Sequence, residues 1–150
     1  MLFMPNLQFS MESHLKPEKL MSFIIDFEHY KNFFPSQLKE VKILEKQNNV
    51  ITTEETVAFT SLLKSSFVQK SRHKLISDKE LLTEIIDGPA KGSVINVKCI
   101  ESDQGSEVTF DADLKLSLKA KFLGPFIKKL YTRYITAVIY KINSRDLEKQ

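Results

Sequence analysis

The chain has 150 residues, 42% of them hydrophobic, and a formal net charge of +3 from 22 basic and 19 acidic side chains. This length predicts one domain (residues 1–150, core about 7–143) that is stable without disulfides. The net charge is far below the density expected of a dedicated nucleic-acid-binding protein, although a local basic patch stays open. No apolar run approaches the ~18 residues that span a bilayer.

The start of the chain predicts a cytoplasmic protein. Met1 to Met4 are apolar but lack the basic region and the cleavage site of a secretory signal, and Pro5 follows at once. The only cysteine, Cys99, has no partner for an internal disulfide, which agrees with a reducing compartment.

The first predicted elements are a strand and a helix. Residues 7–15 alternate weakly between apolar and polar, as in a strand. Lys16-Pro17-Glu18 begins a helix, because proline in the first turn loses no hydrogen bond and a glutamate there interacts favourably with the helix dipole. The helix ends before Pro35 and directs toward the core Leu20, Phe23, Ile24 and Phe27.

Antiparallel strands joined by tight turns follow. Turns are predicted at Asn48-Asn49, at Ser77-Asp78-Lys79 and at Asp103-Gln104-Gly105, and Gly88-Pro89 ends a strand. The predicted strands are residues 39–46, 49–59, 66–77, 80–87, 92–101 and 106–118.

The last strand and the C-terminal helix have the clearest patterns. In residues 106–118 one face carries Val108, Phe110, Ala112, Leu114, Leu116 and Leu118, which is typical of a half-buried antiparallel strand. The helix that follows the Gly124-Pro125 break has an apolar arc of roughly 180°, formed by Phe126, Ile127, Leu130, Tyr131, Tyr134, Ile135, Val138 and Ile142. An arc this wide predicts a helix that lies across a concave sheet, with part of its apolar face lining a cavity.

The predicted fold class is α+β. A curved antiparallel sheet of six to seven strands wraps around the long C-terminal helix, and one or two helices lie between the first two strands. A sheet of this size twists and curls, so that one helix leaves a gap of the kind that holds small molecules.

A D-x-x-x-Y-x-x-F-x-P segment, formed by Asp26, Tyr30, Phe33 and Pro35 with Phe34 inside it, carries a resemblance to a known superfamily. With the helix start at residues 16–18, the Gly88-Pro89 strand end and the closing amphipathic helix, the chain resembles the START-like (SRPBCC, helix-grip, Bet v 1-like) superfamily. The resemblance covers about residues 7–143 and is nearest to the polyketide cyclase/dehydrase and coenzyme Q-binding branch. Coenzyme Q-binding members follow the Gly-Pro site with Phe and then Trp, whereas Ala90 follows here and the chain has no Trp. The resemblance implies carriage or sequestration of hydrophobic ligands, with a minority of members that cyclise polyketides or act on ribosome association.

Two polar residues are the candidates for chemistry. Strand parity turns His73 inward with Phe67, Ser71 and Leu75, and Glu55 lies in phase with Ile51 and Val57. A Glu55 and His73 pair would form the polar end of a pocket or an acid and base couple. The alternatives are a structural histidine bonded within the sheet, solvated edge positions, or a different register.

Other chemistries lack their sequence signals. The three histidines fall in different elements and Cys99 has no C-x-x-C partner, so we predict no metal and no cofactor. Neither a G-x-S-x-G elbow nor a phosphate-binding glycine loop occurs in the sequence. Cys99, on an apolar strand face, is predicted to be an inert core thiol.

Basic residues on one strand face leave a second kind of partner open. Lys70, Arg72 and Lys74 share the outer face of residues 66–77, and Lys128, Lys129 and Arg133 follow on the helix. They could contact RNA, a ribosome or, transiently, an anionic membrane, although such charges usually form a solvated exterior. Asp111 and Asp113 neutralise part of the outer surface.

The sequence therefore favours a binding protein over an enzyme. We predict binding, transport or sequestration of a small hydrophobic ligand (a lipid, an isoprenoid or quinone, or an aromatic polyketide-like molecule) between the sheet and the C-terminal helix. The alternatives are a cyclase or dehydratase in which Glu55 and His73 act as acid and base and Tyr134 orients the substrate, or a ribosome- or RNA-interacting module. The predicted lining residues are Val57, Phe59, His73, Ile95, Val97, Phe110, Leu114, Phe126, Leu130 and Tyr134.

Overall fold

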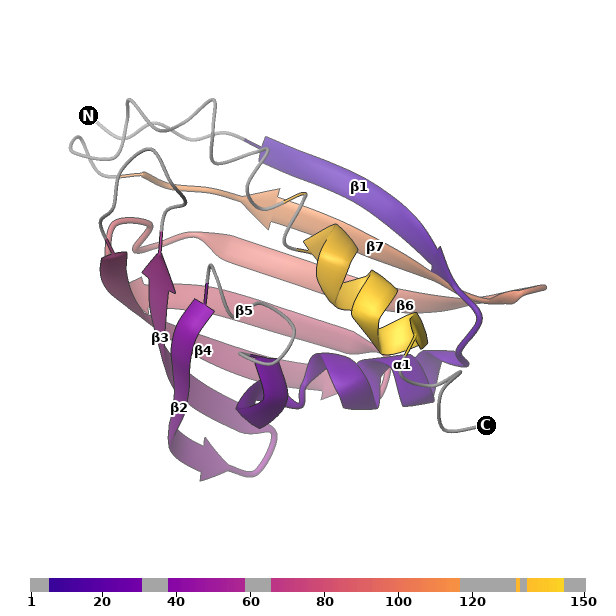
Figure 1. Cartoon of the computed structure of the whole chain (residues 1–150), viewed down its shortest axis with the longest axis horizontal. Coiled ribbons are helices and arrows are strands. Elements are labelled where there is room, and N and C mark those ends of the chain that lie inside the picture. The colour runs from indigo at the N-terminus through magenta and orange to yellow at the C-terminus, as the bar shows by residue number, and fades with distance from the viewer. Residues whose placement is uncertain (1–5, 31–37, 59–65, 117–131, 133–134, 145–150) are drawn as a thin grey trace.

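The structure is a computed structural model that describes residues 6–30, 38–58, 66–116, 132 and 135–144 (Figure 1). It confirms the predicted α+β class: seven antiparallel strands and a C-terminal helix. Residues 132 and 135–144 are helical. The other elements are β1 (Asn6–Ser13), α1 (Pro17–Ile24), the 3-10 helix η1 (Phe27–His29), β2 (Leu38–Gln47), β3 (Val50–Ala58), β4 (Ser66–Ser77), β5 (Glu80–Asp87), β6 (Val94–Ser102) and β7 (Gly105–Asp113).

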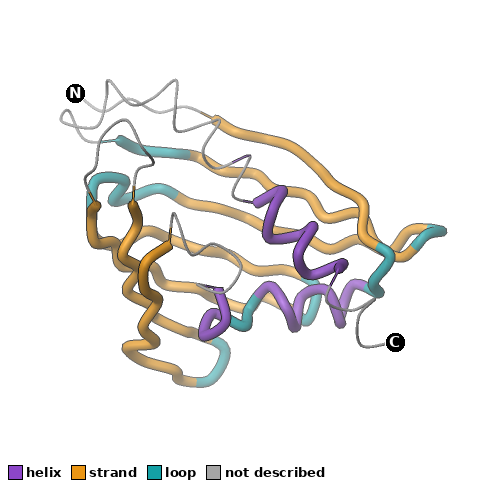
Figure 2. Tube along the Cα trace, in the orientation of Figure 1, coloured by secondary structure: helices purple, strands orange, loops and turns teal. Residues whose placement is uncertain are grey.

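The strands form a single curved sheet in the order β1-β7-β6-β5-β4-β3-β2. Strands β2 to β7 follow one another as a meander, and β1 pairs with β7 at the far edge, with Phe9 opposite Phe110. Figure 2 shows the sheet bending around both described helices. The chain thus crosses from one edge of the sheet to the other through α1 and η1.

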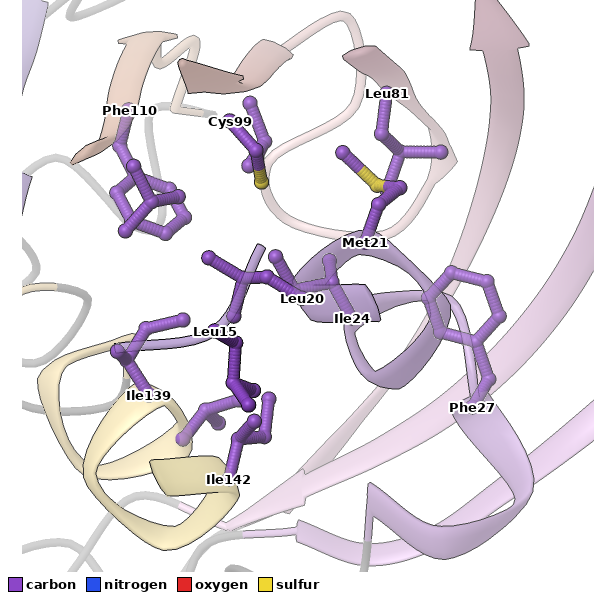
Figure 3. Packing of buried hydrophobic residues seen from close by; sticks show 13 residues of the cluster. Leu15, Leu20, Met21, Ile24, Phe27, Leu81, Cys99, Phe110, Ile139 and Ile142 are labelled. Carbon is purple, nitrogen blue, oxygen red and sulfur yellow. The ribbon is translucent and has the colours of Figure 1, made fainter. Parts of the chain in front are cut away.

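The main core lies between the helices and the inner face of strands β5 to β7. In Figure 3 the side chains of α1 and of the C-terminal helix point toward those of the sheet. This cluster contains the buried residues Leu15, Leu20, Met21, Ile24, Phe27, Leu81, Val97, Cys99, Val108, Phe110, Val138, Ile139 and Ile142. Alternation along β7 follows the prediction, because Val108, Phe110 and Ala112 are buried while Asp111 and Asp113 are exposed.

A second, smaller apolar cluster forms around the end of β7. It contains Ile85, Ala90, Ala112, Leu114 and Leu116. The predicted strand over residues 106–118 is too long, since β7 ends at Asp113. The hydroxyl of Ser93 accepts a hydrogen bond from the backbone N–H of Lys115 at 2.7 Å. At Lys115 a side chain therefore replaces the backbone carbonyl of a neighbouring strand as the hydrogen-bond partner.

The first helix is also shorter than predicted. Helix α1 ends at Ile24, and the N–H of Asp26 then bonds to the carbonyl of Phe23, three residues back. The hydroxyl of Tyr30 donates to the carbonyl of Ile24, which satisfies one of the acceptors that a helix end leaves open. The segment up to Tyr30 is therefore a separate 3-10 turn rather than a continuation of the helix.

Candidate functional site

Polar side chains gather on the inner face of three neighbouring strands, and we call this group the polar cluster. The register places Thr53 opposite Ser71, Glu55 opposite Gln69 and His73 opposite Thr83. All are buried apart from Glu55, whose side chain is 14% exposed. The cluster consists of Thr53 and Glu55 on β3, Gln69, Ser71 and His73 on β4, and Thr83 on β5.

The imidazole of His73 is engaged on both nitrogens and on one ring face. Its Nε2 lies 2.8 Å from Oγ1 of Thr53, and its Nδ1 lies 2.7 Å from Oγ1 of Thr83. The ring of Phe27 stacks on it, with centroids 4.1 Å apart and planes at 24°. His73 is thus held by three elements at once: β3, β5 and η1.

The hydrogen-bond directions follow from the single proton of the Thr53 hydroxyl. That hydroxyl donates to Oε1 of Glu55 at 2.7 Å, so toward His73 it must accept, and Nε2 of His73 carries the proton. In the neutral imidazole Nδ1 then accepts from the hydroxyl of Thr83. A continuous chain of hydrogen bonds therefore runs from Thr83 through His73 and Thr53 to Glu55.

The carboxylate of Glu55 is the end of this chain and the most accessible member of the cluster. Its Oε2 accepts from the hydroxyl of Ser71 at 3.2 Å, while Oε1 accepts from Thr53 and lies 3.8 Å from Nε2 of His73. Two hydroxyl donors offset part of the cost of burying the charge. Each carboxylate oxygen retains lone-pair capacity for a further donor.

The side chain of Gln69 lies beside Glu55 and is incompletely bonded. The residue is only 9% exposed, yet its Oε1 has no hydrogen-bond partner. An unpaired buried acceptor costs about 1–3 kcal/mol. The amide oxygen, itself buried, is therefore an unsatisfied acceptor of the inner face next to Glu55.

A bulge and a glycine position the strand that carries Gln69. The register between β4 and β5 shifts between the pairs Lys70–Asp87 and Ser71–Ile85, which is a β-bulge next to the cluster. Gly88 has φ +112°, and a Cβ there would lie 3.1 Å from the carbonyl of Val68 and 3.3 Å from Cα of Gln69. Glycine at this position allows the loop after β5 to pack on the backbone of β4.

Tyr30 brings a neutral phenol near the cluster. Burial raises the pKa of Tyr30 above its usual value, and the negative charges of Asp26 and Glu55 add to the rise. Its ring packs against that of Phe27, with centroids 5.2 Å apart. At neutral pH Tyr30 is consequently a hydrogen-bond donor and not an anion.

Apart from His73, which belongs to the polar cluster, the predicted lining residues fall into three groups. Val57, Ile95, Val97 and Phe110 belong to or pack against the main core, and Phe110 stacks on Phe9 with centroids 4.9 Å apart. Leu114 is fully buried in the second cluster. Outside the described residues lie Phe59, Phe126, Leu130 and Tyr134. The apolar cavity predicted between the sheet and residues 126–142 therefore stays a prediction.

Several members of the cluster were not predicted from the sequence. Thr53 shares the strand parity of Glu55, Gln69 shares that of His73, and Thr83 shares that of the buried Leu81 and Ile85, so strand parity was the available signal. The contact of Phe27 with His73 had no sequence signal, because it joins residues far apart in the chain.

The outer face of β4 is more nearly neutral than its basic residues indicate. Lys70 lies across from Glu54 on one side and Asp87 on the other, and Arg72 lies across from Glu84. Opposite charges at directly paired positions stabilise the sheet and reduce the field available to a polyanion. Of the predicted basic stripe, only Lys74 has uncharged residues on both sides, Val50 and Leu82.

Within the part of the chain that the structure describes, no group of three His, Cys, Asp or Glu side chains is placed to hold a metal ion. Among the same residues, no helix has the length and apolarity needed to cross a membrane.

Comparison with known proteins gives a family match and several structural neighbours. The sequence profile of the family "polyketide cyclase / dehydrase and lipid transport" matches residues 14–141. No curated protein matches the sequence. The protein TTHA0849 from Thermus thermophilus has a TM-score of 0.81 at 10% identity, with 97% of this chain and 99% of that chain covered.

Two further structures have the same fold. The Zhui aromatase/cyclase from Streptomyces sp. R1128 has a TM-score of 0.77 at 11% identity, with 93% of each chain covered. A START superfamily protein from Mycobacterium smegmatis has a TM-score of 0.72 at 17% identity, with 98% of this chain and 99% of that chain covered. At these identities the likeness concerns the fold alone.

Proposed function

Because this chain belongs to the polyketide cyclase/dehydrase and lipid transport family of the START-like superfamily, we propose that it binds a small hydrophobic ligand against the inner face of its sheet. The observation that carries the proposal is the polar cluster, which lies among apolar inner-face residues. Ligand sites are typically apolar surfaces with a few convergent polar groups.

The surroundings of the cluster fit this description. On one side the inner face continues through Leu75, Leu81, Val97 and Phe110, which lie opposite one another across four strands. On the other side Val57 lies opposite Phe67. A ligand on this face would bury its apolar body on these side chains and turn a polar group toward Glu55 and Gln69.

The state of His73 favours binding over acid–base catalysis by this residue. A general acid or base must reach the substrate proton within hydrogen-bond distance. Both nitrogens of His73 bond to threonine hydroxyls, and Phe27 stacks on its ring. In this arrangement His73 orients Thr53 and Glu55, and it does not face the ligand with a free nitrogen.

An enzyme of the cyclase or dehydratase type is the second candidate, supported by the chain of hydrogen bonds that ends at Glu55. The family includes cyclases and dehydrases, and the Zhui neighbour is an aromatase/cyclase. In such an enzyme Glu55 would exchange a proton with the substrate, and Thr53 and His73 would stabilise its two protonation states. An RNA or ribosome partner has less support, given the acidic residues that lie across from Lys70 and Arg72.

Native mass spectrometry of the purified protein, before and after organic extraction, tests the proposal. We expect a co-purifying apolar compound whose mass is lost on extraction. Binding of N-phenyl-1-naphthylamine, a neutral apolar fluorophore, to the extracted protein provides a second readout that does not depend on the expression host.

Ile95 and Ile100 supply a matched pair of variants. Ile95 lies on the inner face of β6 and packs against both apolar clusters, whereas Ile100, on the outer face of the same strand, is 51% exposed. Ile95→Trp should weaken fluorophore binding about tenfold or more, because a filled site loses the ligand's apolar contacts, and Ile100→Trp should leave it unchanged. Absence of both a co-purifying compound and saturable fluorophore binding would disprove the proposal.

A further inference from the structure

The bonding state of the polar cluster specifies the kind of polar group that a ligand carries. Resting on the binding function proposed above, we infer that the ligand presents an uncharged O–H or N–H donor to Gln69 and Glu55, and not a carboxylate or another anionic group. The site is thus selective for hydrophobic molecules that carry a hydroxyl or a neutral N–H group over fatty acids.

The hydroxyl and imidazole donors of the cluster are already occupied. The Thr53 hydroxyl gives its proton to Glu55, the Ser71 hydroxyl gives its proton to the same carboxylate, and Nε2–H of His73 is bonded to Thr53. Each of these groups has already placed its only proton there. An incoming acceptor such as a carboxylate would find these donors occupied, and would have only the amide N–H groups of Gln69 left to bond with.

The amide oxygen of Gln69 is the acceptor of the cluster that remains unpaired. Oε1 of Gln69 has no partner, and Gln69 is nine-tenths buried directly opposite Glu55. Cross-strand neighbours have Cβ atoms about 5 Å apart, so one donor group can lie between the two side chains. A ligand hydroxyl would supply the hydrogen bond that Gln69 lacks.

The charge of Glu55 disfavours an anionic ligand group. Glu55 is the accessible acid of the cluster, and among the described residues of the inner face no lysine or arginine lies opposite it: its partners across the strands are Val41 and Gln69. A second negative charge beside a partly buried carboxylate is strongly disfavoured. A neutral donor has no such cost.

Three matched probes test the inference on the extracted full chain at neutral pH: 2-naphthol, 2-methoxynaphthalene and 2-naphthoate. They share an apolar body and differ in carrying a donor, an acceptor only, or a negative charge. Affinities come from displacement of N-phenyl-1-naphthylamine. We expect 2-naphthol to bind about tenfold more tightly than 2-methoxynaphthalene, the value of one buried hydrogen bond, and 2-naphthoate to bind most weakly.

Variants assign the preference to individual side chains. Gln69→Leu removes the acceptor at similar volume and should bring the ratio between 2-naphthol and 2-methoxynaphthalene to within about twofold of unity. Val68→Thr, a change on the outer face at the adjacent position where the side chain is exposed, should leave the ratio as in the original chain. Glu55→Gln removes the charge and should raise the affinity for 2-naphthoate about tenfold or more.

The outcomes separate the two proposals. If the fluorophore and all three probes fail to bind, the binding function itself is wrong. If the probes bind but 2-naphthol has no advantage, or 2-naphthoate binds best, the donor preference is overturned while the binding function stands. The ratios in the original chain decide this even if Gln69→Leu does not fold.

Discussion

The carboxylate of Glu55 and the imidazole of His73 approach to 3.8 Å, and the hydroxyl of Thr53 bonds to both. The two ionisable groups are therefore linked through a neutral hydroxyl. This hydroxyl fixes the proton on Nε2 of His73 and holds the orientation of Glu55.

Thr53→Val should destabilise the fold, because valine has the same shape but leaves Nε2 of His73 and Oε1 of Glu55 without their common partner. We expect a loss of about 1–3 kcal/mol in the free energy of unfolding, measured by urea denaturation. Thr52→Val, on the outer face of the same strand, is the control and should change stability by less than about 0.5 kcal/mol. Equal effects of the two substitutions would contradict a bonded role for Thr53.

His73→Gln distinguishes a binding protein from an enzyme that uses the imidazole. Glutamine keeps a donor and an acceptor, so ligand affinity should change by only about 1 kcal/mol. If His73 transfers protons in turnover of the co-purifying compound, the rate should instead fall ~100-fold or more. His29→Gln, a change at an exposed residue paired with Asp26, controls for the loss of an imidazole in general.

The Cys99 thiol should be unreactive in the folded protein. Burial raises its pKa from 9.0 to about 12, and the thiolate is the reactive form. Modification by an aromatic disulfide reagent at pH 8 should therefore be slow until guanidinium unfolds the chain. Rapid stoichiometric labelling without denaturant would show that the thiol is accessible.

The same shift predicts how stability depends on pH. Because the folded protein holds the Cys99 proton to a higher pH than the unfolded chain, the stabilisation is complete below pH 9 and is lost as pH rises from 9.0 toward about 12. The raised pKa of Tyr30 acts in the same direction. We expect the melting temperature of Cys99→Ala, expressed relative to its own value at neutral pH, to fall less steeply over this pH range than that of the unsubstituted protein. Identical slopes would mean that Cys99 does not contribute.

Gly105→Ala should be more destabilising than Gly92→Ala. Both glycines have positive φ, +137° and +93°, which costs alanine about 1–3 kcal/mol. At Gly105 a Cβ would also lie 2.5 Å from the backbone of Ser13 and His14, whereas at Gly92 it would meet only the flexible side chain of Lys115 at 3.2 Å. We expect a loss of about 2–5 kcal/mol at Gly105, measured by urea denaturation. A smaller loss of unfolding free energy at Gly105 than at Gly92 would show that the backbone of Ser13 and His14, at the end of β1, shifts to make room for the Cβ.

Turn residues and local patterns were sufficient to predict most of the sheet. Strands β4 and β5 were predicted with the bounds that the structure has, because a tight turn at Ser77-Asp78-Lys79 joins them and Gly88-Pro89 ends the second. The prediction failed where a side chain replaces a backbone partner: Ser93 ends the β7 ladder at Lys115, and Tyr30 bonds to the end of α1. Hydrogen bonds of this kind, between a side chain and the backbone, produce no periodic pattern in the sequence.

The site was less predictable than the sheet. Parity fixes which face Glu55 and His73 occupy, but not which residues lie opposite them. That depends on the register of β3 against β4, which the alternation of residues along each strand does not set. Whether Thr53 lies beside His73 follows from this register, and the stacking of Phe27 depends on the path of the chain after α1. Both are tertiary relationships.

The family match, residues 14–141, stops just inside both ends of the fold. It omits β1, which pairs with β7 along its whole length, and it omits Ile142, which is completely buried. The two omitted ends are also joined to each other, because the hydroxyl of Ser13 donates to Oδ1 of Asn143 at 2.7 Å. A protein trimmed to the matched range would leave β7 as an open edge strand, the kind of surface on which sheets of separate molecules pair and aggregate.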